Sequence, residues 1–323
     1  MRQTLCCQCA QGPNDVYTQA PKPPGRIIIM VDKINKISLF GRPLRLLPPA
    51  MFLYGILGIS AASQAAQIAA EPAAPTVSYA RLADLVLASP AIARVNIKSA
   101  IVVPAEKAPG LPAGQVRFYV QAETLGLIRG ETVVARRIAF LLDGPAERAK
   151  KPGLKGRTLL AFGKGGAQVD QFQLTSSTAL IDWSAANEAL VRKVLADALA
   201  PDLPPAITAV TSAFHVSGAV LGEGETQVFL DTANNTPISL SIIRRPDEQP
   251  HFSASLGEIV DEAASLPPAG TMLWYRLACG LPERLPARAL REAEPADASA
   301  ASRDYAAFRA ALSPCDRTAK PIF

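Results

Sequence analysis

Residues that bind metals or act as nucleophiles in recognisable motifs are scarce in this sequence. The chain has two histidines in 323 residues, His215 and His251, too few for an HExxH motif or any zinc site built on several histidines. It contains neither a Gly-x-Ser-x-Gly nucleophile elbow nor a Ser-x-x-Lys motif. The glycine-rich stretch Gly163–Gly166 lacks the Gly-Lys-Ser/Thr continuation of a phosphate-binding P-loop. The sequence therefore predicts no metal site and no cofactor, and it names no catalytic residue.

A long apolar run is also missing. The unbroken apolar run Met51–Ile59 has nine residues, about half of the roughly 18 to 20 that a transmembrane helix needs. Arg42 and Arg45 precede this run, and Ser60–Ala66, rich in small residues, follows it. The order of basic, apolar and small residues is typical of a secretory signal peptide. We predict cleavage after Ala65, which leaves no stable transmembrane span; a retained N-terminal membrane anchor is the alternative.

The segment before the apolar run is longer than a signal peptide requires. Translation from Met30 would give the signal an ordinary basic n-region, so we assign residues 30–65 to the signal peptide. Residues 1–29 are then an over-called translation start or a disordered extension. Their three closely spaced cysteines (CCQC) lack the second pair of ligands that a structural zinc site needs.

An excess of positive charge is absent from the exported part of the chain. The whole sequence has 33 basic and 28 acidic residues. Residues 1–65 hold seven of the basic and two of the acidic ones, which leaves 26 of each sign after cleavage. A neutral protein has no electrostatic footprint for nucleic acid. We therefore expect an exported, periplasmic or secreted protein with no nucleic-acid partner.

The first part of the exported chain, residues 76–200, has the pattern of a small β-rich lobe. Ser78 can cap a short helix that ends before Pro90. The apolar period then changes to the alternation of strands. It is clearest in 115–123, where Val116, Phe118, Val120 and Ala122 would point inward and Arg117, Tyr119, Gln121 and Glu123 outward. Five strands are expected, at residues 95–103, 115–123, 132–142, 158–162 and 169–174. Short strands in this order, without long helices between them, predict a small antiparallel barrel that is OB-like.

One amphipathic helix separates this lobe from a second one. Ser184 can cap the helix, which we expect to run to Leu199, and the prolines of 201–205 end it. Residues 206–323 return to the period of strands, expected at 207–220, 226–232, 238–243, 252–256 and 271–279. A short helical turn around 258–264 and a last helix from Ser302 complete the pattern. The predicted fold class is α+β, with two antiparallel β-rich lobes bridged by one helix.

The histidines are the best candidates for catalysis. Regular alternation along 207–220 would place the bulky Phe214 and Val216 on one face of the strand and His215 on the other. A histidine there could act as a general base. The sequence cannot supply the geometry of a Ser/His/Asp set. His251 stands in a proline-flanked turn.

Charged clusters offer two further sites. The acids Glu258, Asp261 and Glu262 would share one helical face, which could hold a cation but is more often only solvated. The basic loop Arg148–Arg157 could meet phospholipid head groups or lipopolysaccharide, or serve only solubility.

Cys279 and Cys315 are the strongest local signal in the exported chain. They are the only cysteines after residue 65, and export delivers them to an oxidising compartment. We predict a disulfide that ties the tail of the second lobe to its sheet. Two free thiols are the alternative.

Two segments resemble known sequences. Gly224–Thr232 (GETQVFLDT) and Leu273–Cys279 (LWYRLAC) are similar to segments of an uncharacterised family of exported bacterial proteins. The resemblance implies no activity, ligand or site residue.

Two hypotheses of function follow. The first is an exported soluble envelope protein that binds or scaffolds an unidentified partner or ligand without catalysis. The alternative is a periplasmic hydrolase-like enzyme that uses His215 or His251 with nearby carboxylates. Both histidines with acids in one deep pocket would favour the enzyme; scattered histidines and a shallow surface would favour the binding protein.

Overall fold

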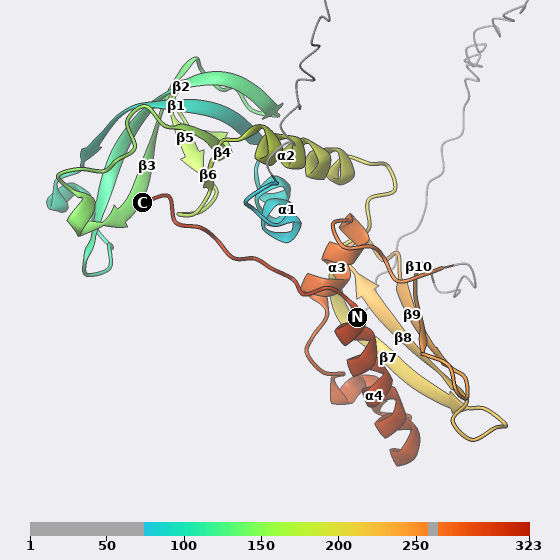
Figure 1. The fold of residues 1–323 in the computed structure, drawn as a ribbon. Coiled ribbons are helices and arrows are strands. Elements are labelled where there is room, and N and C mark those ends of the chain that lie inside the picture. The colour runs from blue at the N-terminus through green and yellow to red at the C-terminus, as the bar shows by residue number, and fades with distance from the viewer. Residues whose placement is uncertain (1–73, 258–263) are drawn as a thin grey trace, which may run out of the picture. The chain divides into compact units, whose positions relative to one another are not determined.

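Two antiparallel sheets and four α-helices make up the part of the chain that the structure describes, residues 74–257 and 264–323 (Figure 1). The structure is a computed structural model. Its secondary structure gives the α+β class that the sequence predicted. The described residues belong to one compact unit, so the lobe boundary at 201–205 stays a prediction. The predicted signal peptide, the extension before it and the acids Glu258, Asp261 and Glu262 lie outside the described residues.

The first sheet contains six strands. They are β1 (Ala91–Val102), β2 (Gln115–Gly130), β3 (Arg137–Pro145), β4 (Thr158–Gly165), β5 (Phe172–Leu174) and β6 (Leu180–Asp182). Their order is β3-β2-β1-β4-β5, with β6 beside β4, and all named pairs are antiparallel. The five predicted strands are all present with shifted ends, and β6 is an additional one.

The described strands do not close into a barrel through a continuous ladder. β3 ends the strand order on one side, and a single parallel bridge joins its Ala139 to Gln171, next to β5. The OB-like barrel therefore stays a prediction. Short 3-10 turns lie in the loops of this lobe, at Ala105–Lys107 and Ala146–Arg148.

Alternation along β2 gives the first sheet a core face and an outer face. Phe118, Val120 and Ala122 are buried in a core shared with β1, β3 and β4, as the sequence predicted. Tyr119 and Gln121 point the other way and are exposed. A polar face on β2 thus leaves room for solvent or a ligand.

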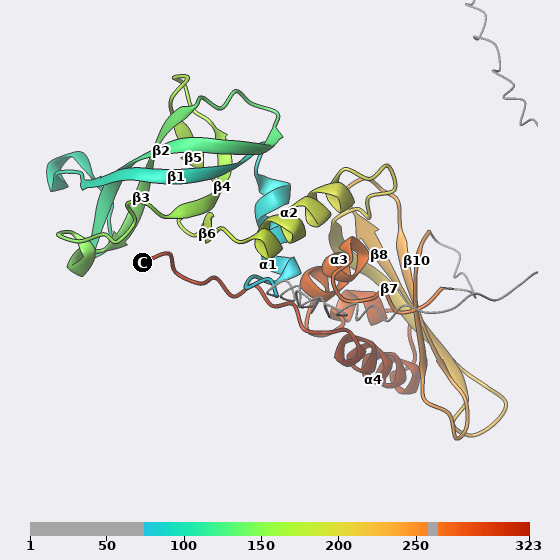
Figure 2. The same cartoon turned by 45° about the horizontal axis from the view of Figure 1, so that its top comes forward.

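Two capped helices, α1 (Tyr79–Ala88) and α2 (Ala185–Ala198), lie side by side (Figure 2). Both predicted caps are confirmed: Ser78 accepts from the backbone N–H of Arg81, and Ser184 from that of Asn187. The apolar sides of both helices join a core that includes β4, the second sheet and α3. The bridging role of α2 stays a prediction.

The second sheet has four strands in the order β10-β9-β8-β7. They are β7 (Ile207–Ser217), β8 (Gly224–Thr232), β9 (Ile238–Arg244) and β10 (His251–Leu256). Between β8 and β9 the sequence pair Asn234-Asn235 predicts a hairpin turn. The structure confirms it, since Asn235 has a φ of 61°, which asparagine tolerates better than most residues.

The strand predicted at 271–279 is wrong, because these residues form helix α3 (Met272–Gly280). The hydroxyl of Thr271 accepts a hydrogen bond from the backbone N–H of Trp274 and caps the helix. A short, nearly continuous apolar run does not distinguish a strand from a buried helix by its period. Packing decides here, because Trp274 and Leu277 are buried in the core that α1 and the second sheet share.

The last helix, α4 (Pro295–Ala311), begins before the predicted Ser302. Proline is well suited to the first helical position, where its missing N–H is no loss. A 3-10 turn, Ala287–Leu290, precedes it. Figures 1 and 2 show α4 lying along β7 and β8, so it covers one face of the second sheet.

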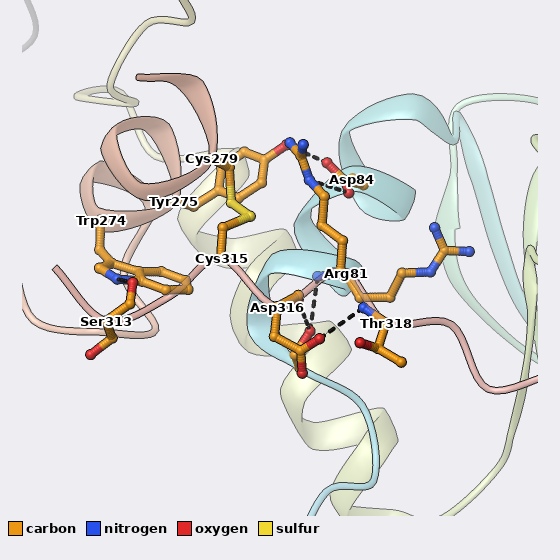
Figure 3. The surroundings of a disulfide bond; sticks show 11 residues. Arg81, Asp84, Trp274, Tyr275, Cys279, Ser313, Cys315, Asp316 and Thr318 are labelled. Atoms are coloured by element: carbon orange, nitrogen blue, oxygen red, sulfur yellow. Dashed lines mark hydrogen bonds and ion pairs between the residues drawn. A yellow bond between two sulfur atoms is a disulfide. The ribbon is translucent and has the colours of Figure 1, made fainter. Parts of the chain in front are cut away.

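A disulfide joins α3 to the segment after α4. The sulfur atoms of Cys279 and Cys315 lie 2.07 Å apart, as the sequence predicted. Figure 3 shows Trp274 beside this bond, where its indole N–H donates to the carbonyl of Ser313. We name residues 313–323 the tail segment; it is thus fastened to α3 at two neighbouring points.

Candidate functional site

Two adjoining hollows lie along β2 and β3 of the first sheet. One has a volume of about 730 Å³ and the other of about 470 Å³. Both are lined by Tyr119, Ala139 and Asp170. The loop after β4, residues 166–177, forms the opposite wall of the larger hollow. We call the two together the sheet groove.

The groove follows from the strand register. In the antiparallel pair, Arg117 lies opposite Asp143, Tyr119 opposite Leu141, Gln121 opposite Ala139 and Glu123 opposite Arg137. Residues two apart on a strand point to the same face, so these four pairs form four rows on the outer face. The sequence predicted the outward set on β2, but not the wall from the loop.

An ion pair with two parallel hydrogen bonds closes one end of the groove. Arg117 donates from Nε to one carboxylate oxygen of Asp143 at 2.7 Å and from a terminal nitrogen to the other at 2.9 Å. About a quarter of each side chain is exposed. The hydrogen bond with Asp143 raises the pKa of Arg117 above its ordinary value. The two parallel hydrogen bonds hold the guanidinium and the carboxylate in a fixed, planar orientation.

The middle of the groove is apolar. Tyr119 is 36% exposed and Leu141, directly opposite, is 53% exposed. Single exposed apolar side chains are common on protein surfaces, but these two lie directly opposite each other in a hollow, with charged pairs on both sides. An aromatic ring with a polar hydroxyl suits contact with a ligand that is part apolar and part polar.

A second set of charges closes the other end. Lys98 lies 3.0 Å from Glu123, and Arg136 lies 3.3 Å from the same carboxylate. The hydrogen bond from Lys98, the largest influence, lowers the pKa of Glu123 below its ordinary value. The formal charges of the residues that line the groove cancel. Three are cations and three are anions: Arg117, Lys98 and Arg137, and Asp143, Glu123 and Asp170.

Backbone hydrogen bonds fix the loop wall. The N–H of Ala139 on β3 donates to the carbonyl of Asp170 at 2.7 Å. Within the loop, the N–H of Gly166 donates to Gln171 at 2.8 Å, and that of Gln171 to Gln168 at 3.0 Å. These bonds hold the polar loop side chains at the groove before any ligand arrives.

His215 lies on the face of β7 opposite Phe214 and Val216, as the alternation predicted, and His215 is on the buried face. A β-bulge lies between Val210 and Ser212 in the pairing of β7 with β8. A bulge adds one residue to one strand and reverses the alternation after it. Phe214 and Val216 are therefore exposed, by 42% and 61%, whereas the side chain of His215 is only 10% exposed.

His215 belongs to a buried polar group that we call the Asp304 cluster: His215, Thr226, Arg244 and Asp304. The Thr226 hydroxyl donates to one carboxylate oxygen of Asp304, and Arg244 Nε donates to the other. Nδ1 of His215 lies 2.9 Å from the Thr226 oxygen. Because the threonine proton goes to the carboxylate, Nδ1 must carry the proton of the histidine–threonine bond.

This geometry is unsuited to nucleophilic catalysis. A serine or threonine nucleophile gives its proton to a neighbouring base, but Thr226 gives its proton to Asp304 and accepts one from His215. Thr226 is also fully buried. His251 is exposed and lies opposite Ile243. The row of His215 runs through Thr226 to Ile242, the neighbour of Ile243. Because neighbouring residues on a strand point to opposite faces, the two histidine side chains lie on opposite faces of the sheet. The two histidines are thus not brought together.

Sequence reasoning missed both the sheet groove and the Asp304 cluster. For the cluster a signal was present, since Asp304 stands beside Tyr305 and four residues before Phe308 on the apolar side of α4. A carboxylate on a buried helix face needs a partner. The groove could not have been found, because its wall, residues 166–177, comes about 20 or more residues after the end of β3 at Pro145.

The basic loop Arg148–Arg157 lines neither hollow of the sheet groove. Its Arg157 is committed to Asp182 and to the carbonyl of Ile322. Within residues 74–257 and 264–323, no three or more histidine, cysteine or acidic side chains are grouped to hold a metal ion. In the same ranges no helix has the length and apolarity to cross a membrane.

The chain matches no protein-family model, and a search of curated proteins gives no match. The resemblance of Gly224–Thr232, now β8, and of Leu273–Cys279, now within α3, to exported bacterial proteins stays a prediction.

Proposed function

We propose that this chain is an exported envelope protein that binds a ligand in the sheet groove without transforming it. The observation that carries the proposal is the exposed Tyr119–Leu141 row. It lies between the Arg117–Asp143 ion pair and the Lys98–Glu123 ion pair. Concave sites with an apolar middle and a few oriented polar groups are the usual form of ligand sites. Periplasmic or secreted localisation belongs to the proposal and rests on the predicted signal peptide.

The strand order supports an OB-like first lobe. An OB-fold is a five-stranded, partly open barrel that binds ligands on the face of strands 2 and 3 and at the loop between strands 4 and 5. Here the order β3-β2-β1-β4-β5 and the parallel bridge between Ala139 and Gln171 agree with that topology. The sheet groove lies at the corresponding place. In this proposal α2 links the OB-like lobe to the second one.

The hydrolase alternative has less support. It needs His215 or His251 beside an acid in an accessible pocket. The acid beside His215 is Asp304, which is 2% exposed and already accepts from Thr226 and Arg244. Neither histidine lines the sheet groove or the hollow between α1 and α2 and the tail segment.

Photo-crosslinking tests the groove directly. A benzophenone amino acid introduced at Leu141 should capture the ligand in intact cells, because this side chain is 53% exposed in the middle of the groove. The matched control is Leu127, also a leucine on the first sheet and 50% exposed, but outside the groove. We expect an ultraviolet-dependent product at Leu141 and none at Leu127, detected by gel shift and mass spectrometry.

Equal products at both positions, or none at Leu141 in protein of normal abundance, would contradict ligand binding in the groove. A second benzophenone at Leu221, which is 97% exposed in the β7–β8 loop, measures background capture by the other sheet.

Export has its own measurement. The intact mass of the protein isolated from the periplasm or the medium should match a chain that begins at Ala66, because the small residues before it suit signal peptidase. Protein that remains in the cytosol, or exported protein that retains Met51–Ile59, would contradict the cleaved signal.

A further inference from the structure

We propose that a second site, separate from the sheet groove, binds a small organic monocarboxylate. The site is a hollow of about 160 Å³, which we name the tail hollow. Its walls come from the first turn of α1 with the residues before it, from β6 with the start of α2, and from residues 318–322 of the tail segment. The tail hollow shares no lining residue with the sheet groove.

Two cations in the tail hollow have no counter-charge. Three charged residues line it: Arg81, Asp182 and Lys320. Asp182 is already paired with Arg157 at 2.6 Å. Arg81 and Lys320, in contrast, form no ion pair within residues 74–257 and 264–323.

The sum of these charges favours a monoanion. The three lining residues give an excess of one positive charge. The excess is still one when Arg157 and Asp316 are included, the latter two residues before Thr318 in the tail segment. A ligand with one negative charge therefore neutralises the hollow, whereas an uncharged ligand leaves both cations without a partner.

Neutral groups hold Arg81 in position. Its Nη2 donates to the carbonyl of Thr178 at 2.8 Å and to the hydroxyl of the same residue. These acceptors orient the guanidinium but leave its charge uncompensated. Its Nε and Nη1 keep three N–H groups for charge-assisted hydrogen bonds to an anion. Figure 3 shows Arg81 beside Thr318 of the tail segment, and both residues line the hollow.

The floor of the tail hollow is fixed before any ligand arrives. Asn187 is 1% exposed, accepts from the backbone N–H of Thr76 at 2.9 Å and donates to the carbonyl of Asp182 at 2.9 Å. Ser184 caps α2 at the same place, so the positive end of the helix dipole adds to the two cations. Binding therefore orders few groups at the floor.

The walls of the tail hollow are in large part apolar. The apolar side chains that line it are Val77, Leu180, Ile181, Trp183, Ala319 and Ile322. A bare inorganic anion leaves these walls without a partner, whereas a hydrocarbon part would bury them. The volume lies below the range of about 300 to 1,000 Å³ for drug-sized ligands. A carboxylate with a short aliphatic chain or one aromatic ring, the size of hexanoate or benzoate, combines these properties.

The experiment uses the processed, disulfide-bonded protein and isothermal titration calorimetry. Hexanoate and benzoate are the probes, benzamide is the uncharged analogue of benzoate, and inorganic phosphate is the bare anion. We expect saturable binding of at least one carboxylate with a Kd of about 1 mM or lower. Benzamide and phosphate should give no saturable heat at the same concentrations.

Variants test the two cations. Arg81→Gln should weaken carboxylate binding by about tenfold or more, because a charge-assisted hydrogen bond is lost. Lys320→Gln, at an exposed position that folding does not depend on, should weaken it by about threefold or more. Arg309→Gln is the matched control, since Arg309 also lies on a helix and donates to a backbone carbonyl, that of Glu283, but outside the hollow. It should leave the affinity unchanged.

Hydrogen exchange locates the bound carboxylate. At saturation it should slow exchange in residues 318–322 and at the starts of α1 and α2, and leave residues 166–177 of the sheet groove unchanged.

The inference is wrong if neither carboxylate binds, or if benzamide or phosphate binds as tightly. Unchanged affinity in both Arg81→Gln and Lys320→Gln would also reject it, as would protection of residues 166–177 in place of the tail segment. These outcomes leave ligand binding in the sheet groove untouched, because crosslinking at Leu141 tests that site separately.

Discussion

Replacing Asp304 by alanine is expected to lower the free energy of unfolding by about 1.5 to 3 kcal/mol, because it removes hydrogen bonds to a buried carboxylate, while the Arg244 side chain left behind is 36% exposed. Asp304 is 2% exposed, and its two carboxylate oxygens accept hydrogen bonds from Thr226 and Arg244. Without the carboxylate, the buried Thr226 hydroxyl loses the acceptor of its proton and is left with His215 Nδ1 as its neighbour. The guanidinium of Arg244 also loses its counter-charge at the helix–sheet contact.

Chemical denaturation of the variant, monitored by circular dichroism, measures this loss. Asp304→Asn keeps the size and one acceptor oxygen, so it should cost less than alanine but more than a surface change. Asp297→Ala, in the first turn of the same helix, is the control and should cost at most about 1 kcal/mol. A loss below about 1 kcal/mol for Asp304→Ala would show that the cluster does not hold α4 to the sheet.

Substitution of the two histidines distinguishes a structural role from a catalytic one. His215→Ala removes one hydrogen bond to Thr226 but leaves Thr226 bonded to Asp304, so its stability cost should be near 1 kcal/mol plus lost packing. His251→Ala should cost little, because His251 is exposed. Loss of the cellular role in either variant, at normal abundance, would favour the hydrolase alternative.

The second large effect is expected from the disulfide. Reduction of Cys279–Cys315 should lower the free energy of unfolding by up to about 4 kcal/mol, because the bond closes a loop with a sequence separation of 36. Such a loss is a large share of the 5 to 15 kcal/mol that is typical of a folded domain. Thermal unfolding with and without reductant, and of the Cys279→Ser/Cys315→Ser double variant, gives the size of the effect.

The tail segment should loosen first on reduction. Beyond the disulfide it is held by single contacts: Trp274, Ser78 and Arg157 donate to the carbonyls of Ser313, Asp316 and Ile322. Arg317 also pairs with Asp84 at 2.9 Å, and the Phe323 ring packs against Phe118 of the first core at a centroid distance of 5.3 Å. In Figure 3 the disulfide lies close to Tyr275, whose hydroxyl also donates to Asp84. Hydrogen exchange should therefore rise in 313–323 before it rises in the sheets.

Arg317→Ala serves as the control, because an exposed ion pair contributes at most about 1 kcal/mol. Non-reducing peptide mapping of exported protein establishes whether the bond forms in the cell. Two thiols that can be alkylated without reductant would reject the disulfide.

The sequence by itself determined the features that depend on neighbouring residues. Ser78 and Ser184 cap α1 and α2 where they were predicted, because a cap is a contact with a backbone N–H three residues away. The inward set on β2, Phe118 to Ala122, follows from simple alternation. The pairing of Cys279 with Cys315 needed only a count of cysteines in the exported chain.

Only the tertiary structure decided the features that depend on distant residues. One bulge on β7 turned His215 toward the helix, because a shift of one residue reverses every side chain after it. Leu273–Cys279 became a helix rather than a strand because its apolar residues found partners in the shared core. The sheet groove and the Asp304 cluster each join elements about 20 or more residues apart, and the local sequence pattern carries no information about such contacts.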